Sequence, residues 1–223
     1  MVAELLDTTT IGAKTYRRIR ADIVFGRLPP GERLTLDRMR TAYATSVSTL
    51  REVLNRLSSE GLIVAEGSRG FEVTPVSASN LREVAAMRCL LESHAIRESF
   101  EAGNMDWEGQ VVAAHHKLAS MERKMSAGER AMAETWKRYD REFHHALISA
   151  CGSRVLLETY ATIYDRYLRY QMIAAVYRGD IAAAEHRRLL DCALKRDWKT
   201  AQSTLTKHVN DCVEHMISKR LVR

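Results

Sequence analysis

The distribution of proline constrains the fold of this chain more than any other feature of its sequence. The three prolines lie at positions 29, 30 and 75, and residues 76–223 contain none. Proline interrupts helices and pushes the residue before it toward extended structure. The sequence therefore predicts a short N-terminal part with interrupted elements, followed by a long helical part that begins after Pro75.

Membrane and secretory signals are absent from the sequence. It has no apolar run of about 18 residues and no basic-then-apolar leader at its start. Four cysteines lie far apart in helix-like segments without CxxC spacing, which predicts reduced thiols rather than disulfides. We therefore expect a cytoplasmic protein that does not interact with membranes.

Positive charge is concentrated near the N-terminus. The formal net charge of the whole chain is +6, while residues 14–56 contain ten Lys or Arg and four Asp or Glu. The entire excess thus lies in one short segment, and the rest of the chain is nearly balanced. A clustered basic segment favours an acidic polymer such as DNA as a partner.

This basic segment has the pattern of three helices followed by a β-hairpin. Apolar spacing predicts helices from Lys14 to Gly26, from Thr35 to Tyr43, and from Thr45 to Gly61. Two apolar stretches, 62–64 and 71–73, flank a glycine-containing turn and predict the two strands of the hairpin. Helix, helix, helix and hairpin is the element order of a winged helix-turn-helix.

The third of these helices has the composition of a helix that enters the DNA major groove. Small and hydrogen-bonding residues lie on one face and aliphatic residues on the other. Alone, this pattern is more often an ordinary amphipathic surface helix, but the hairpin and the proline-glycine turn favour DNA binding. The candidate DNA contacts are Arg38, Arg40, Ser46, Ser48, Thr49, Arg51, Arg69 and Gly70.

Three blocks of sequence resemble the GntR family of bacterial regulators: LPPGERL at 28–34, STLREVLNRL at 48–57 and EGLI at 60–63. The helical remainder is similar to the FadR-type branch, with its FCD ligand-binding domain. The resemblance implies a homodimeric repressor that binds double-stranded operator DNA and that a small metabolite regulates. Val47 and Asp37 stand where the family commonly has arginine, which leaves the operator sequence open.

The segment Thr74–Ser79 predicts a linker. We expect a winged helix-turn-helix domain over 1–76 and an all-helical effector- and metal-binding domain over 77–223. The predicted fold class is mainly α, with a six-helix antiparallel bundle of the FCD kind after the linker. The expected helices span approximately 79–102, 106–126, 128–150, 153–177, 180–195 and 197–219, with Ser153, Asp180 and Asp197 as N-caps.

Asp140 and His144 are four residues apart, so both side chains project from one face of a helix. By spacing alone a metal site is the minority interpretation, because lone histidines are usually hydrogen-bonded surface or core residues. The resemblance implies more: Asp-x-x-x-His followed by His186 and His208 is similar to the metal-binding FCD pattern. It implies a divalent ion, zinc first and nickel or manganese as alternatives. The remaining histidines, at 94, 115, 116, 145 and 215, stay unassigned.

Arg88 lies on the first bundle helix, where an arginine of this domain commonly faces the cavity. A guanidinium beside a metal would bind a carboxylate through two hydrogen bonds. The competing interpretation is a simple salt bridge to Glu92, four residues on. Weaker candidates for the effector cavity are Tyr139, Tyr164 and Arg169, although such aromatic and basic repeats are more often part of a packed helix.

Together these patterns predict a transcriptional repressor, not an enzyme, released from its operator by a small organic acid bound at a metal-containing pocket. It would associate with the nucleoid when bound to DNA. One alternative is a regulator for which the metal ion itself is the signal. Another is a metal-dependent hydrolase with a DNA-binding appendage, which the lack of HExxH, Gly-x-Ser-x-Gly and Walker-type motifs disfavours.

Overall fold

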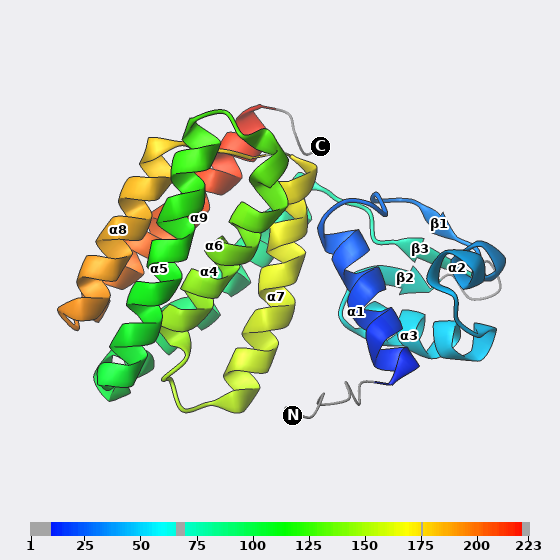
Figure 1. The fold of residues 1–223 in the computed structure, drawn as a ribbon, viewed down its shortest axis with the longest axis horizontal. Helices are drawn as coiled ribbons and strands as arrows, with labels where there is room; N and C mark the ends of the chain where they lie inside the picture. The colour runs from blue at the N-terminus through cyan, green and yellow to red at the C-terminus, as the bar shows by residue number, and fades with distance from the viewer. Residues whose placement is uncertain (1–9, 66–69, 175, 220–223) are drawn as a thin grey trace, which may run out of the picture. The chain divides into compact units, whose positions relative to one another are not determined.

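The computed structural model describes residues 10–65, 70–174 and 176–219. The chain divides after Pro75 into two compact units, Met1–Pro75 and Val76–Arg223 (Figure 1). The predicted domain boundary was one residue later. The first unit is a small mixed domain and the second is entirely helical in its described part, which confirms the predicted fold class.

The first unit is built on three helices, α1 (Ile11–Val24), α2 (Leu36–Tyr43) and α3 (Val47–Ser59). Helix α3 packs against both α1 and α2. Leucines on its inner face are fully buried, as are Ile19 and Ile23 of α1, which anchors α3 and leaves its polar face exposed. The helices predicted from apolar spacing therefore all form.

A three-stranded antiparallel sheet completes this unit, in the order β1 (Arg33–Leu34), β3 (Phe71–Val73), β2 (Ile63–Ala65). The predicted hairpin corresponds to β2 and β3, and β1 is an additional strand. Its two residues are too few to show a period, and only the long-range pairing of Arg33 with Glu72 identifies it. The turn between β2 and β3, which contains Arg69, lies outside the described residues.

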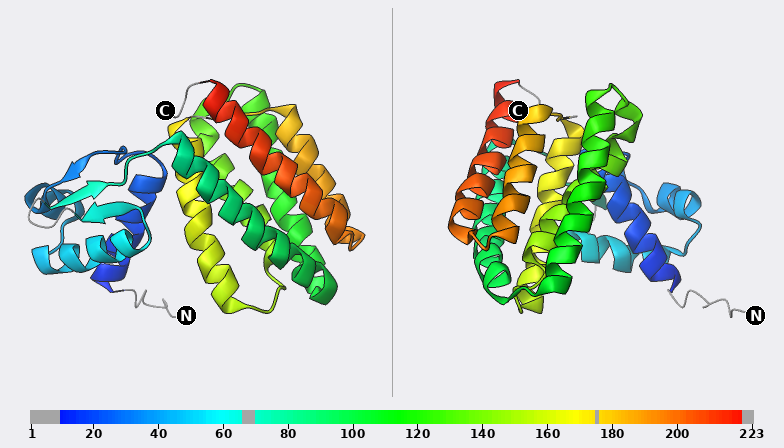
Figure 2. Two further views of the ribbon diagram at one scale, coloured as in Figure 1. Left: turned by 180° about the vertical axis from the view of Figure 1, so that it is seen from behind. Right: turned by 60° about the vertical axis from the view of Figure 1, so that its left-hand side comes forward.

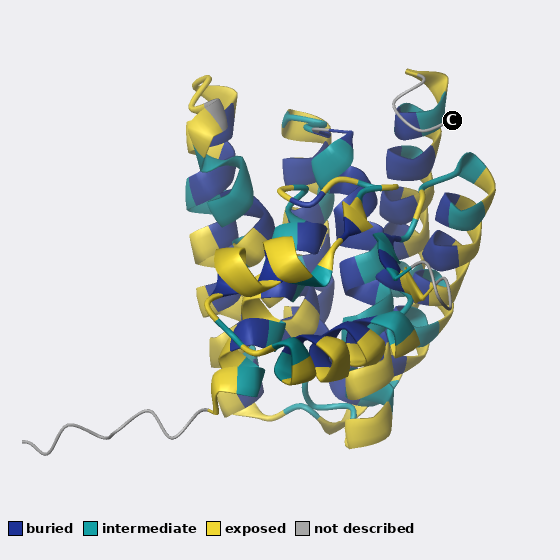
Figure 3. Cartoon of the chain, turned by 90° about the vertical axis from the view of Figure 1, so that its right-hand side faces the viewer, coloured by how far each residue is buried: buried dark blue, intermediate teal, exposed yellow. Residues whose placement is uncertain are grey.

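The second unit is a bundle of α4 (Ala78–Ala102), α5 (Met105–Ser126), α6 (Ala133–Ile148), α7 (Arg154–Ile173), α8 (Asp180–Leu194) and α9 (Trp198–Ser218). Successive helices run in opposite directions (Figures 1 and 2). Helix α4 packs against α6, α7 and α9, while α5 packs against α6 and α8. Buried and exposed positions alternate along the helices, as amphipathic patterning requires (Figure 3). None of the described helices has the length and hydropathy needed to span a membrane.

Two of the three N-caps predicted for the bundle are observed. Ser153 and Asp197 accept hydrogen bonds from the backbone of their first turns, as predicted. The prediction for Asp180 was wrong: Gly179 occupies the N-cap with φ +58°, a conformation that favours glycine, and Asp180 is the first helical residue. Helix α4 begins at Ala78 with Ser77 as its cap, so the segment between the two units is shorter than expected.

Candidate metal centre and nucleic-acid interface

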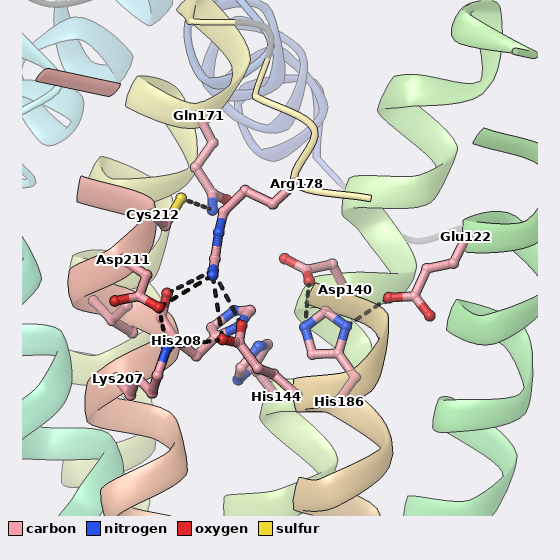
Figure 4. A network of polar contacts seen from close by, with 12 residues as sticks. Glu122, Asp140, His144, Gln171, Arg178, His186, Lys207, His208, Asp211 and Cys212 are labelled. Atoms are coloured by element: carbon pink, nitrogen blue, oxygen red, sulfur yellow. Dashed lines mark hydrogen bonds and ion pairs between the residues drawn. The ribbon is translucent and has the colours of Figure 1, made fainter. Parts of the chain in front are cut away.

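Three histidines from three helices meet inside the bundle. His144 on α6, His186 on α8 and His208 on α9 are buried, and one ring nitrogen of each lies within 4.8 Å of the others. Positions separated by 42 and 22 residues in the sequence are thereby brought together (Figure 4). Three imidazoles at this spacing form the core of a site for a divalent transition metal.

Each of these imidazoles is held by a carboxylate at its Nδ1 atom. A carboxylate only accepts hydrogen bonds, so Nδ1 carries a proton, and in the neutral form of the ring Nε2 then presents a lone pair. This is the arrangement by which proteins orient histidine ligands of a metal. The donors and acceptors are His144 Nδ1 to Glu92 Oε1 (2.6 Å), His186 Nδ1 to Glu122 Oε1 (2.6 Å) and His208 Nδ1 to Glu185 Oε2 (2.8 Å).

The inward-facing nitrogens are available to a ligand. Nε2 of His144 and Nε2 of His186 are buried and accept no hydrogen bond from the described residues. Burial lowers the pKa of His144, and it lowers the pKa of His208 to about 3 despite the hydrogen bond to Glu185. Both rings are therefore neutral near pH 7, which is the form that binds metals.

Asp140 adds a carboxylate to the three histidines. Its Oδ1 lies 3.3 Å from His186 Nε2, and its Oδ2 accepts a hydrogen bond from the Tyr164 hydroxyl at 2.9 Å. Nζ of Lys137, one turn earlier on α6, lies 3.4 Å from Oδ2. Burial favours the neutral acid, but Lys137 and the histidines hold the pKa of Asp140 well below its usual range. The donor set of three imidazoles and one carboxylate fits a divalent cation.

Arg88 is fully buried beside this cluster. Its contacts fit in part both interpretations drawn from the sequence, a salt bridge to Glu92 and a donor for a bound carboxylate. Its Nε donates to Glu92 Oε2 at 2.9 Å, so the expected salt bridge forms. The guanidinium carbon lies 4.5 Å from the ring centre of Tyr164 and 4.7 Å from that of Tyr167. Both terminal nitrogens remain without a hydrogen-bond partner among the described residues. They form the two-pronged donor that a carboxylate would need.

The other two predicted effector residues contact different side chains. Tyr139 is half-buried on α6, where Lys117 Nζ lies 5.9 Å from its ring centre. Arg169 is buried next to Tyr170, with 5.8 Å from the guanidinium carbon to that ring. Of the predicted cavity residues, the structure therefore brings Arg88 and Tyr164 to the cluster.

Sequence reasoning missed the carboxylates that orient the histidines, and it missed Lys137. Glu92 and Glu122 lie 52 and 64 residues from the histidines that they bind, so no local pattern connects them. Lys137 had a signal that was not used: it precedes Asp140 by three residues, so the two share a helix face.

The predicted DNA contacts on α3 form one exposed surface. Ser46 caps the helix by accepting a hydrogen bond from Thr49 N–H at 3.1 Å, while Ser48 and Arg51 are exposed on the following turn. The tight turn before α3 requires Ala44 to adopt a left-handed conformation, with φ +48°. An exposed N-terminal turn with small polar residues and an arginine is suited to the major groove.

The remaining candidates around this surface differ in their surroundings. Arg40 and Arg51 are exposed and form no ion pair with another described residue, so both are available to phosphate or bases. Arg38 is also exposed but forms an ion pair with Glu32. Gly70 directly precedes β3 with φ +98°, and Arg69 lies outside the described residues.

Family models match most of the chain. Residues 83–211 match the FCD domain, and residues 12–73 match the family described as bacterial regulatory proteins, gntR family. The two matches coincide with the two units of the fold.

Two curated relatives span nearly the whole chain. BphR of Paraburkholderia xenovorans (strain LB400), named an HTH-type transcriptional regulator, is 34% identical over 201 residues, covering 89% of this chain and 82% of its own. GlaR of Escherichia coli (strain K12), named an HTH-type transcriptional repressor, is 28% identical over 200 residues, covering 87% of this chain and 90% of its own. These names confirm the prediction of a transcriptional regulator rather than an enzyme.

Solved structures share the fold. E. coli McbR/YncC superposes with a TM-score of 0.81 at 18% identity, covering 96% of this chain and 100% of that one. A GntR regulator of Rhodococcus sp. RHA1 gives a TM-score of 0.77 at 19% identity, covering 94% of this chain and 99% of that one. At these identities the likeness concerns the fold alone.

Proposed function

The chain belongs to the GntR family of bacterial regulatory proteins and carries an FCD domain, and from this premise we propose that it is a metabolite-responsive repressor. A divalent metal, zinc by preference, would be held by Asp140, His144, His186 and His208. A small organic acid bound there would release the protein from its operator. The observation that supports the metal is the set of three imidazoles, each fixed by a carboxylate at Nδ1, with the Nε2 atoms of His144 and His186 buried and without a hydrogen-bond partner among the described residues.

The chain supplies its own groups for holding an acid. When bound, the ion would contribute positive charge and open coordination positions for a carboxylate. Arg88 would donate from its two terminal nitrogens, and the rings of Tyr164 and Tyr167 keep its guanidinium plane in place. Glu92 accepts hydrogen bonds from both Arg88 and His144, so a displacement of either residue would also displace the other.

Helix α7 offers a route from this pocket to the DNA-binding unit. The hydroxyl of Tyr170, six residues after Tyr164, accepts the N–H of Ser77 at 3.4 Å and donates to Asn80 at 2.9 Å. Ser77 is the N-cap of α4 and Asn80 lies in its first turn, and α4 begins three residues after Pro75. A shift of α7 on effector binding would therefore move the segment that leads to the reading helices of a dimer, and their spacing would cease to match the operator.

Metal analysis of the purified protein tests the first part of this proposal. We expect about one ion per chain in the wild type, loss of that ion in His186→Ala, and retention in His116→Ala, which removes an exposed imidazole from α5. A wild type that binds no Zn²⁺, Ni²⁺ or Mn²⁺ at micromolar concentrations would refute the metal site.

Operator release tests the second part. The DNA would be a duplex selected by the protein itself from a random library, and release would be followed by fluorescence anisotropy. We expect metal-loaded protein to stay bound until a carboxylic acid is added, and Arg88→Met to require much more acid. Release by Zn²⁺ alone would instead identify the ion as the signal.

A further inference from the structure

A pocket lies in the bundle, next to the candidate metal centre. Its volume is about 450 Å³, and it is formed by the end of α5, the start of α6, the end of α7 and part of α9. Apolar and aromatic side chains make most of its wall, including Met125, Trp136, Met172 and Tyr177. This volume falls in the range of pockets that hold drug-sized ligands, roughly 300–1,000 Å³.

One charged side chain of this pocket reaches the metal centre. Lys137 lines the pocket, is 5% exposed, and has its Nζ 3.4 Å from Asp140 Oδ2. The same Nζ lies 4.0 Å from the ring centre of Trp136, so the ammonium group is flanked by a carboxylate and an aromatic face. Lys137 is thus the junction between the pocket and the candidate metal ligands.

Two further pocket residues have polar atoms that nothing in the described protein satisfies. Trp136 Nε1 is buried without an acceptor, and Gln171 Oε1 is buried without a donor. The amide nitrogen of Gln171 is already directed to Cys212 Sγ at 3.3 Å, which fixes the orientation of that side chain. A buried polar group without a partner is unfavourable, so these atoms indicate a site for an occupant with polar groups of its own.

The side chains of the pocket wall indicate that the occupant has an apolar or aromatic group. The rings of Trp136 and Tyr177 meet edge to face at 5.3 Å, and Tyr177 is anchored through its hydroxyl to the backbone oxygen of Glu122 at 3.2 Å. Met125 and Met172 are flexible and polarisable, and they adapt well to planar or branched apolar groups. An acid of two or three carbons would leave most of this surface uncovered.

We propose that the pocket binds the apolar or aromatic body of the effector, whose acid group extends past Lys137 to the candidate metal centre and Arg88. The effector is then a carboxylic acid with an aromatic ring or a chain of roughly six or more carbons, rather than a short hydroxy acid. This inference rests on the proposed function, because it assigns the specificity of the same effector site.

Isothermal titration of the metal-loaded, full-length protein with acetate, butanoate, hexanoate and phenylacetate tests the proposal. Each buried methylene should tighten binding roughly fourfold, so hexanoate should bind on the order of 100-fold more tightly than acetate. Ala133→Leu places additional side-chain volume in the pocket, two turns of α6 away from Asp140. This variant should keep its metal and its acetate affinity but lose the dependence on chain length.

Ala113→Leu is the matched control, because it makes the same substitution at an exposed position of α5. It should behave as the wild type with all four acids. Equal affinity for acetate and hexanoate, or an Ala133→Leu series that parallels the wild type, would overturn the assignment of the pocket and leave the proposed function standing. Metal-loaded wild type that binds none of the acids would overturn both.

Discussion

Replacement of Glu92 by glutamine tests whether the buried arginine and the metal centre depend on one carboxylate. Glu92 Oε2 accepts from Arg88 Nε at 2.9 Å, and its Oε1 accepts from His144 Nδ1 at 2.6 Å, with all three side chains fully buried. Burial raises the pKa of Glu92, yet Arg88 and His144 together hold it below its usual value, so the group is an anion. Glutamine retains the shape but has one acceptor oxygen for two donors, and no charge.

We expect two separate effects of Glu92→Gln, one on stability and one on metal affinity. Removing one partner of a buried ion pair leaves the Arg88 guanidinium uncompensated, which costs about 3–5 kcal/mol of unfolding free energy. Loss of the group that orients His144 should weaken metal binding about 10- to 100-fold. Glu122→Gln is the matched control, because Glu122 orients His186 but has no buried guanidinium to neutralise. It should weaken metal binding similarly and lower the unfolding free energy by only about 1–3 kcal/mol.

Urea unfolding of the metal-free protein and metal competition against a chromophoric chelator measure these effects. All three tryptophans, at 107, 136 and 198, lie in the helical bundle, so their fluorescence follows that unit without interference from the other. A metal-free Glu92→Gln protein as stable as the wild type would refute the reasoning that Arg88 depends on this carboxylate. Unchanged metal affinity in both variants would refute the role of the carboxylates in orienting the imidazoles.

Three further predictions follow from individual positions. Arg51→Ala should weaken operator binding about 5- to 150-fold in gel-shift titrations, whereas Arg154→Ala, which removes the same charge from an exposed site in the bundle, should not change it. Burial raises the pKa of the Cys89 thiol to about 11. The rate of its alkylation by iodoacetamide, measured by mass spectrometry, should therefore rise roughly tenfold per pH unit between pH 8 and 10. A rate that reaches a plateau by pH 9 would contradict this. Gly103→Ala should destabilise the bundle by about 1–3 kcal/mol, because the added Cβ would lie 2.4 Å from the ring of Trp107. Gly109→Ala is the matched control inside α5, where the added Cβ meets open space, and it should stabilise the bundle by about 0.5–1 kcal/mol. Thermal unfolding that ranks the two variants in the opposite order would contradict the packing argument.

Local patterns predicted much of the fold, because helix formation depends on neighbours only a few residues apart. Apolar spacing indicated α1, α2 and α3, and the absence of proline after Pro75 indicated the bundle. Caps were predicted where a side chain has an evident partner, as at Ser153. The prediction failed at Asp180, where the backbone conformation of Gly179 starts the helix, and at β1, where two residues are too short to show a period.

The candidate site was only partly visible in the sequence. Asp140 and His144 share a helix face through their spacing, but only the resemblance to a family made a metal site with His186 and His208 the favoured interpretation. The sequence by itself determined which faces of the helices are apolar and which residues are able to bind metal, acid or DNA. Tertiary packing alone decided that Glu92 meets His144 and that Lys137 separates a pocket from the candidate metal centre, because contacts between different helices depend on their crossing and rotation, which no local pattern encodes.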